Sequence, residues 1–296
     1  MPRSTELRPG SCPLSVLIPA KNERGNIEAC IRSAAFASDV VVVDSGSTDG
    51  TSDLARALGA RVVDFKWDGR FPKKKNWALE HVDWRNEWVF ILDADERITP
   101  ELADELAEKV ARPDCEGYYV NRRFWFIDGW LRHCGYYPSW NLRFFRHAKG
   151  RYERPPGTDR SDSGDNEVHE HVVLQGRAGW LAHEMEHFAF PSIEVWIEKH
   201  NRYSNWEARI DFGDGDHADA GSLAPVLARK RRLKAFAQRL PFRPTLRFLY
   251  HYVARAGFLD GYRGYVFCRL MGIYEFWNTA KRRELARHGR DASPGR

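Results

Sequence analysis

The sequence predicts an α/β fold in which a mostly parallel sheet is flanked by helices, followed by a helical C-terminal region. Three observations support this prediction. Over roughly the first third of the chain, short apolar runs alternate with segments of helical periodicity, which is the pattern of βαβ units. The four consecutive valines of Val40–Val43 indicate a strand covered on both faces. From Pro191 onward, the pattern is helical.

The individual elements follow from apolar runs and from capping signals. Thr99 followed by Pro100 is a helix start, and Gly59 is a helix stop. No GxGxxG pattern accompanies the first strand, so the usual dinucleotide-binding fingerprint is absent. The expected strands are Leu14–Ile18, Val40–Val43, Arg61–Asp64 and Trp88–Leu92, and the expected helices are Asn26–Phe36, Asp49–Leu58, Lys73–Val82 and one that follows Thr99.

Composition places the chain among globular proteins of a reducing compartment. It has 296 residues, of which 43% are hydrophobic and 29% are charged. Its five cysteines are scattered and never form a CxxC pair, which argues against a disulfide scaffold. The first ten residues lack the apolar core of a signal peptide, and no run of 18 apolar residues occurs. We therefore expect a cytoplasmic protein without a membrane span.

Polar clusters follow three of the expected strands, at residues 19–23, 44–49 and 93–96. Ligands of open α/β sheets bind beyond the carboxyl ends of the strands, where a carboxylate can accept hydrogen bonds from a base or a ribose. Two aspartates one residue apart, such as Asp93 and Asp95, can face a divalent cation that also holds a diphosphate. Any one cluster alone suits a helix cap or a surface loop, but three at successive strand ends favour a binding site.

In this order and spacing, the motifs resemble the family-2 glycosyltransferases with the GT-A fold. The matching segments are Pro19–Glu23, Val41–Thr51, Lys75-Asn76 and Leu92–Glu96. A narrower similarity, to the bacterial lipopolysaccharide core β-glucosyltransferase branch, spans nearly the whole chain. It is carried by His133–Pro138, Arg143–Arg146, Val168–Glu170, His187 and Gly257–Gly261.

The resemblance implies a GT-A-like catalytic domain over residues 1–189, with a donor half at about 12–112 and an acceptor half at about 113–189. Residues 190–296 would form a separate helical, basic region. Within the donor half, Pro19, Ala20 and Glu23 would line the nucleoside pocket, and Asp44 would accept a hydrogen bond from the pyrimidine base.

The resemblance also implies roles for the groups around the diphosphate. Lys75 would lie near the nucleotide and Asp93 near the ribose or the metal. Asp95 would bind the metal, Mg²⁺ or Mn²⁺, and His187 would complete the metal shell or contact the diphosphate. Two alternatives stay open: Lys75 is a solvated helix charge beside Lys73 and Lys74, and His187 is a packed core histidine.

The implied reaction is the inverting transfer of a hexose, with glucose expected, from a UDP-sugar to a lipid-linked or lipopolysaccharide-core saccharide. Direct displacement needs a base that takes the proton of the acceptor hydroxyl. The resemblance places the acceptor side at Val168–Glu170, so Glu170 is the expected base. Glu167 and Asp128 are the alternatives.

The C-terminal region is strongly basic. From Ser222 onward there are 17 Lys and Arg against 4 Asp and Glu, a balance of +13. Arginines alternate with aromatic and aliphatic residues at helical spacing over Phe242–Trp277, and Phe248, Leu249 and Trp277 are candidates for insertion into lipid. We expect an anionic membrane partner and a peripheral position at the inner face of the cytoplasmic membrane, where a membrane-anchored acceptor would lie.

Two other interpretations of this basic region are a helical cap on the catalytic domain and nucleic-acid binding through Arg229–Arg232. The interleaved aromatics favour a membrane surface, so we expect no nucleic-acid partner.

A rival from another class is a zinc metallopeptidase, because His183–His187 matches HExxH. That motif requires both histidines on one face of a helix, with the glutamate as base. Here the segment follows the strand-like stretch Gly176–Leu181 and leaves little room for a helix before Pro191. We therefore disfavour the peptidase.

Overall fold

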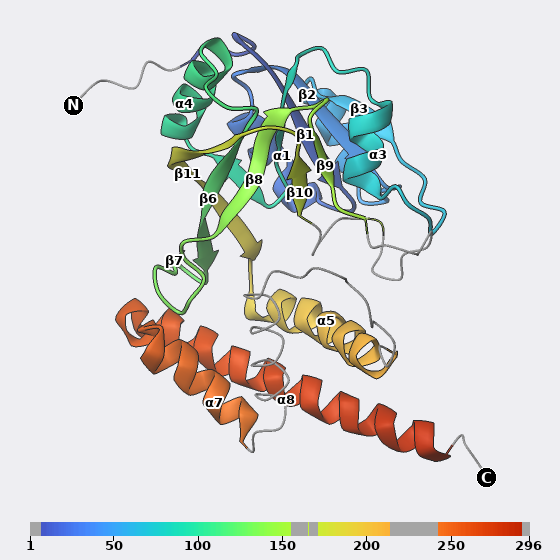
Figure 1. Ribbon diagram of the computed structural model, residues 1–296, viewed down its shortest axis with the longest axis vertical. Coiled ribbons are helices and arrows are strands. Elements are labelled where there is room, and N and C mark those ends of the chain that lie inside the picture. Colours follow the sequence, from blue (N-terminus) through green and yellow to red (C-terminus); the bar gives the residue numbers. More distant parts are fainter. Residues whose placement is uncertain (1–6, 155–164, 166–170, 214–241, 292–296) are drawn as a thin grey trace. The chain divides into compact units, whose positions relative to one another are not determined.

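Figure 1 shows the protein as a computed structural model, which describes residues 7–154, 165, 171–213 and 242–291. The side chains of residues 206, 209–213 and 288–291 are not described. The chain divides into two compact units. Unit 1 comprises Met1–Trp125 and Pro138–Ala189, and unit 2 comprises Phe126–Tyr137 and Phe190–Arg296. Unit 2 therefore includes the segment Phe126–Tyr137, which lies within the expected acceptor half at about 113–189.

Unit 1 is built on one sheet with the strand order β3-β2-β1-β4-β8-β6-β11-β5, and a second sheet pairs β9 with β10. The strands are β1 Cys12–Ala20, β2 Ala37–Asp44, β3 Arg61–Asp64, β4 Trp88–Ile91, β5 Glu96–Ile98, β6 Gly117–Phe126, β8 Trp140–Arg146, β9 Gly150–Tyr152, β10 Val172–Leu174 and β11 Ala178–Phe190. The short strand β7 Gly129–Trp130 belongs to unit 2. The helices are α1 Arg24–Ser33, α2 Thr51–Ala57, α3 Lys74–His81 and α4 Pro100–Ala111.

The first strands are buried on both faces of the sheet. Successive side chains point to opposite faces, and each face packs into its own apolar cluster. In β1, Val16 and Ile18 pack with Ile27 of α1, whereas Leu17 packs on the opposite face with Leu79 of α3. The valines of β2 divide in the same way. A strand that is buried on both faces reads as a continuous apolar run, which is why the valine run predicted one.

The predicted fold class is confirmed, and the sheet is mixed. β1 pairs in parallel with β2 and β4, and β2 pairs in parallel with β3. No helix lies between β6 and β8, so no crossover connection reverses the chain direction, and the two strands pair antiparallel. β8 also pairs antiparallel with β4. Phe90 of β4 is paired with Phe144 of β8. This antiparallel register brings Arg143 toward the carboxyl end of β4.

Unit 2 is mainly helical and contains α5 Ile193–Gly213, α7 Arg243–Leu249, the π-helical turn η1 Tyr250–Ala254, the 3-10 turn η2 Gly257–Asp260 and α8 Gly261–Asp291. Its core includes Trp196, which is fully buried and stacks on His200 with ring centroids 3.6 Å apart. Lys281 of α8 donates hydrogen bonds to Asn201 and Ser204 of α5. Packing and polar contacts therefore join α5 to α8.

Within unit 2, Asp260 and His251 hold the segment Phe126–Tyr137 on the C-terminal helices. The Asp260 carboxylate accepts hydrogen bonds from the backbone N–H groups of Arg132 and His133 at 3.2 and 2.8 Å. It also lies 3.0 Å from Nδ1 of His133. Nδ1 of His251 lies 2.7 Å from the carbonyl oxygen of Cys134. These contacts explain why a segment so far away in the sequence belongs to the helical unit.

Over the residues that the structure describes, none of the helices combines the length and the apolar character needed to cross a membrane.

We predict that the protein loses stability as the pH falls from about 6.5 toward 4. Burial lowers the pKa of His200, and likewise that of His251, to about 4. The unfolded chain therefore binds protons in this range that the folded chain does not, and stability falls with pH. At pH 5 the loss is about 2 kcal/mol for each histidine. Denaturant unfolding of His200→Phe, which keeps an aromatic ring against Trp196, should show a shallower loss of stability between pH 7.5 and 5.

The same substitution at the exposed His171 is the control, and its pH dependence should match that of the wild type. Equal slopes for His200→Phe and the wild type would contradict a neutral, buried His200.

Candidate active site

The loops that follow β1 and β2 are joined by hydrogen bonds at the carboxyl ends of these parallel strands. Asn22, at φ 56°, donates its backbone N–H to the Ser47 hydroxyl at 2.8 Å, and its side-chain oxygen accepts the N–H of Thr48 at 2.8 Å. The N–H of Glu23 donates to the Thr51 hydroxyl at 2.9 Å. Two loops far apart in sequence thus form one rigid rim.

The predicted donor-binding residues of this region come together at that rim. Pro19 and Ala20 lie inside β1, where Ala20 pairs with Asp44. Asp44 is buried, and its carboxylate accepts hydrogen bonds from the backbone N–H of Ser47 at 2.9 Å and from the Ser47 hydroxyl. The Glu23 carboxylate accepts a hydrogen bond from Asn26 at 2.8 Å.

A cavity of about 540 Å³ opens beside this rim. Its walls combine aromatic rings, cations and carboxylates, and the lining residues are Lys21, Ser45, Gly46, Asp64, Phe65, Lys66, Trp67 and Asp165. A volume of this size suits a small organic ligand. The two rings can contact a flat base, and the lysines can contact an anionic group.

The three consecutive lysines Lys73, Lys74 and Lys75 at the start of α3 are buried, with at most 3% of each residue exposed. The alternative in which Lys75 is a solvated helix charge is therefore wrong. Nζ of Lys74 donates to the carbonyl oxygen of Ala20 at 3.0 Å and lies 3.2 Å from the Asp165 carboxylate. Lys75 is directed to Asp93, at 2.8 Å.

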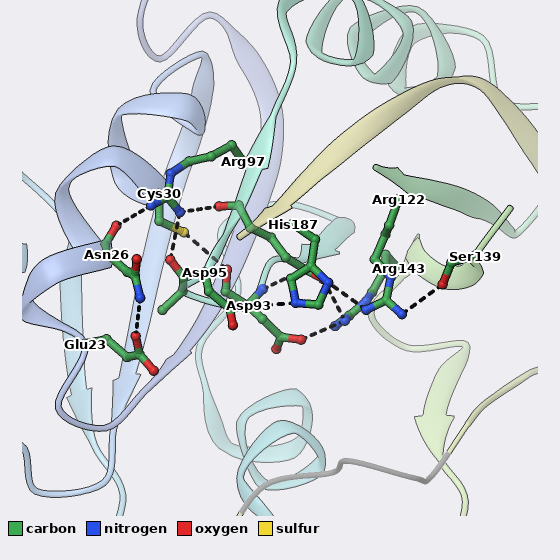
Figure 2. A network of polar contacts seen from close by, with 12 residues as sticks. Glu23, Asn26, Cys30, Asp93, Asp95, Arg97, Arg122, Ser139, Arg143 and His187 are labelled. Atoms are coloured by element: carbon green, nitrogen blue, oxygen red, sulfur yellow. Dashed lines mark hydrogen bonds and ion pairs between the residues drawn. The ribbon is translucent and has the colours of Figure 1, made fainter. Parts of the chain in front are cut away.

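Asp93 is the centre of a largely buried charge network, part of which Figure 2 shows. Its carboxylate lies 2.7 Å from Arg143 of β8 and 2.8 Å from Lys75. The Arg143 guanidinium also reaches Glu96 at 3.2 Å, and Arg122 of β6 reaches Glu96 at 3.3 Å. Three cations thus meet two carboxylates, with Glu96 fully buried.

Charge pairing within the network shifts the pKa values of Asp93 and Lys75. Burial by itself raises the pKa of Asp93, but Arg143 and Lys75 outweigh burial and hold this pKa well below its usual range. Burial by itself lowers the pKa of Lys75, and the Asp93 carboxylate raises it above the ordinary value. Asp93 is therefore ionised and already neutralised by two cations, which leaves it poorly suited to binding a metal ion as well.

Asp95 and His187 form a second pair at the same strand ends. Nε2 of His187, on β11, lies 3.7 Å from the Asp95 carboxylate, and the backbone N–H of Phe188 donates to the Asp95 carbonyl at 2.8 Å. The His187 ring meets Phe124 edge-on at 5.6 Å. The histidine is thus packed against the core, with Nε2 directed at a carboxylate.

The zinc-peptidase alternative is excluded by secondary structure. His183–His187 lies within strand β11, not on a helix. His183 lies 2.9 Å from Glu105, and His187 lies near Asp95, so each histidine has a different carboxylate partner. Within the described part of the chain, no three His, Cys, Asp or Glu side chains are grouped to hold a metal ion by themselves.

The sequence interpretation gave no role to Arg143, Glu96 or Arg122, although Arg143 and Glu96 fell inside segments that carried the resemblance. The signal was the position of Arg143 between apolar residues of a strand, where a buried arginine requires a carboxylate partner. Glu170 and Glu167 lie outside the described residues. Asp128 belongs to unit 2, and its carboxylate lies 3.3 Å from Arg263.

Comparison with known proteins identifies the family of this chain. The model of glycosyl transferase family 2 matches residues 15–164, about half of the chain. A lipopolysaccharide core biosynthesis glycosyltransferase of Rhizobium meliloti, LpsC, is 31% identical over 95% of this chain and 95% of its own length. An uncharacterized glycosyltransferase of Rickettsia typhi is 27% identical over 94% of this chain and 89% of its own.

Among solved structures, glucosyl-3-phosphoglycerate synthase of Mycobacterium tuberculosis is 28% identical with a TM-score of 0.31, covering 38% of this chain and 44% of that one. At this TM-score the likeness supports no conclusion about ligands. The family match and the full-length similarity are sufficient on their own. The chain belongs to glycosyl transferase family 2.

Proposed function

We propose that this glycosyltransferase moves a hexose, glucose in the simplest case, from a UDP-sugar to a membrane-anchored saccharide with inversion at the anomeric carbon. The observation that carries the proposal is the meeting of the cavity, Asp44 and the Asp93 network at the carboxyl ends of β1, β2 and β4. This is the edge at which open α/β sheets bind nucleotides.

The donor's nucleoside fits the cavity side of this edge. Phe65 and Trp67 offer ring faces for a pyrimidine. The Asp44 carboxylate, with Ala20 beside it on β1, can accept an N–H from a base, which distinguishes uracil from a ring without that donor. Glu23 follows on the adjoining loop, which is tied to Thr51. Pro19 fixes the backbone that leads into this pocket.

The diphosphate would lie toward Lys75, Asp95 and His187. Asp95 and His187 provide one oxygen and one nitrogen ligand, so they fit a Mg²⁺ or Mn²⁺ ion whose remaining ligands come from phosphate oxygens and water. When bound, the cation would neutralise the charge that develops on the departing UDP. The excess positive charge of the Asp93 network would act in the same direction without moving.

On the acceptor side, Glu170 would be the base that removes the proton of the acceptor hydroxyl while this hydroxyl attacks the anomeric carbon. Glu167 is the alternative base. The full-length similarity to a lipopolysaccharide core glycosyltransferase supports a lipid-linked or core saccharide as acceptor. Such an acceptor and the basic C-terminal region together support a cytoplasmic enzyme that is peripheral at the inner face of the membrane.

We predict that UDP binding requires a divalent cation held by Asp95 and His187. Titration calorimetry with UDP and Mn²⁺ should show affinity about 10- to 100-fold weaker in Asp95→Asn and in His187→Ala, because each loses a ligand to a charged centre. His183→Ala is the matched control, since His183 lies on the same strand but contacts Glu105. Unchanged UDP affinity in the presence of EDTA would remove the metal from the proposal.

We predict that Glu170→Gln retains UDP-sugar affinity but transfers the sugar roughly 10²- to 10⁴-fold more slowly, because a positioned base is lost. Single-turnover kinetics with a saturating donor would measure this effect. Glu167→Gln is the paired variant: a collapse of its rate, with Glu170→Gln as fast as the wild type, would assign the base to residue 167. The product of an α-linked donor should be β-linked, and an α-linkage would rule out direct displacement.

A further inference from the structure

Unit 2 carries an exposed apolar surface on α7, η1, η2 and the start of α8, which we call the α7–α8 face. It is formed by Leu246, Leu249, Val253, Phe258, Leu259 and Tyr262, which are 43–77% exposed. The first three recur at intervals of three and four residues, so they lie on one side of the helical segment. Soluble monomeric proteins rarely leave such a group of apolar side chains uncovered, and a surface of this kind marks an interaction site.

Aromatic stacking makes the α7–α8 face one continuous surface. The rings of Phe248 and Tyr252 stack at 5.1 Å, and Tyr252 meets Tyr265 at 5.9 Å and Phe258 at 6.2 Å. These contacts join α7 and η1 to η2 and α8. Phe248 is therefore half-buried within the α7–α8 face, whereas Leu249 is exposed. Trp277 is also half-buried. Of the three residues expected from the sequence to insert, only Leu249 belongs to the exposed set.

The exposed charged side chains within residues 242–278 are all arginines. Arg247, Arg255 and Arg269 are exposed, and Arg269 lies over the Phe248 ring at 5.2 Å. The two carboxylates within residues 242–278 are both engaged: Asp260 is buried against His133, and Glu275 pairs with Arg243. The elements of the α7–α8 face therefore carry three exposed guanidinium groups, one of them over a ring of the face, and no exposed carboxylate within residues 242–278.

We infer that the α7–α8 face lies on the surface of a bilayer that contains anionic lipid. Its six apolar side chains enter the headgroup region, and the three arginines bind lipid phosphates. The inference rests on the proposed function, because a membrane-anchored acceptor is what gives such a surface a use. Arg229–Arg232, the basic cluster singled out in the sequence, lies outside the described residues, and the inference does not depend on it.

Other occupants match this chemistry less well. A symmetric dimer would bring the same arginines of two copies toward one another, and like charges repel across an interface. Duplex nucleic acid would neutralise the arginines but would leave the leucines and the valine without an apolar partner. A bilayer satisfies both kinds of side chain at once.

The test is co-sedimentation of the full-length protein with vesicles of phosphatidylcholine alone or with 30% phosphatidylglycerol. Binding should require phosphatidylglycerol and weaken with salt. Changing Arg247, Arg255 and Arg269 to serine should reduce partitioning on the order of a hundredfold. Leu259→Ser with Tyr262→Ser should reduce it at least about tenfold. Hydrogen exchange should show protection of peptides within residues 246–265 when vesicles are present.

Matched controls change the same chemistry on unit 1. The triple variant Arg32→Ser, Arg56→Ser and Arg112→Ser removes three exposed positive charges, as the unit 2 triple variant does. Val173→Ser with Trp180→Ser removes two exposed apolar side chains. Equal losses in the unit 1 and unit 2 variants would overturn the α7–α8 face as the docking surface. So would a wild-type protein that ignores these vesicles and instead binds duplex DNA, or forms a dimer that Leu259→Ser and Tyr262→Ser dissociate.

UDP affinity, measured in solution without vesicles, separates this inference from the proposed function. The α7–α8 variants should bind UDP as the wild type does. Failure of UDP binding in the wild-type protein would sink the donor proposal while leaving vesicle binding as an independent result.

Discussion

The Asp93 carboxylate and the two cations that neutralise it form the contact on which the site in unit 1 depends. An ionised carboxylate in the interior is costly unless opposite charges and hydrogen bonds surround it. Arg143 comes from β8 and Lys75 from α3, so the cluster exists only when a strand, a helix and the carboxyl end of β4 are in their places. Removing Asp93 would leave the buried Lys75 ammonium without this carboxylate, which is more damaging than losing a surface pair.

This network also determines which groups remain available for a ligand. Asp93 is occupied by Lys75 and Arg143, whereas Asp95 lies next to His187. The two aspartates of one short motif thus have different environments. Cationic groups that are already held in place need not reorganise when negative charge develops on a leaving group, and this is the condition under which electrostatics accelerates a reaction.

Unit 2 is held together by other kinds of contact than the site in unit 1. Its interior is held by stacking, as in Trp196 on His200, and by the carboxylate of Asp260, which holds the segment around His133. Its α7–α8 face keeps leucine, valine and aromatic side chains exposed. An enzyme whose acceptor is anchored in a bilayer gains from such a face, because confinement to the membrane raises the local concentration of its substrate.

The sequence alone determined the fold class, the first strands and helices, and the strand-end motifs. It could do so because a parallel strand buried on both faces is a continuous apolar run, and because loop residues such as Asp44 and Asp93 follow these strands directly in the chain. The order of elements is local information. The family resemblance rested on the same local segments, and the similarity to known glycosyltransferases agrees with it.

Only the tertiary structure decided the partners of these residues. In the sequence, Lys73–Lys75 look like a run of solvated charges. In the folded protein they are buried, with Lys74 paired to Asp165 and Lys75 paired to Asp93. Arg143 is fifty residues from Asp93 in the chain, and the antiparallel register of β4 with β8 is what brings them together. Likewise, HExxH in the sequence became two separate histidine–carboxylate pairs on a strand. Charge pairing depends on distance in space, and short sequence patterns do not encode that distance.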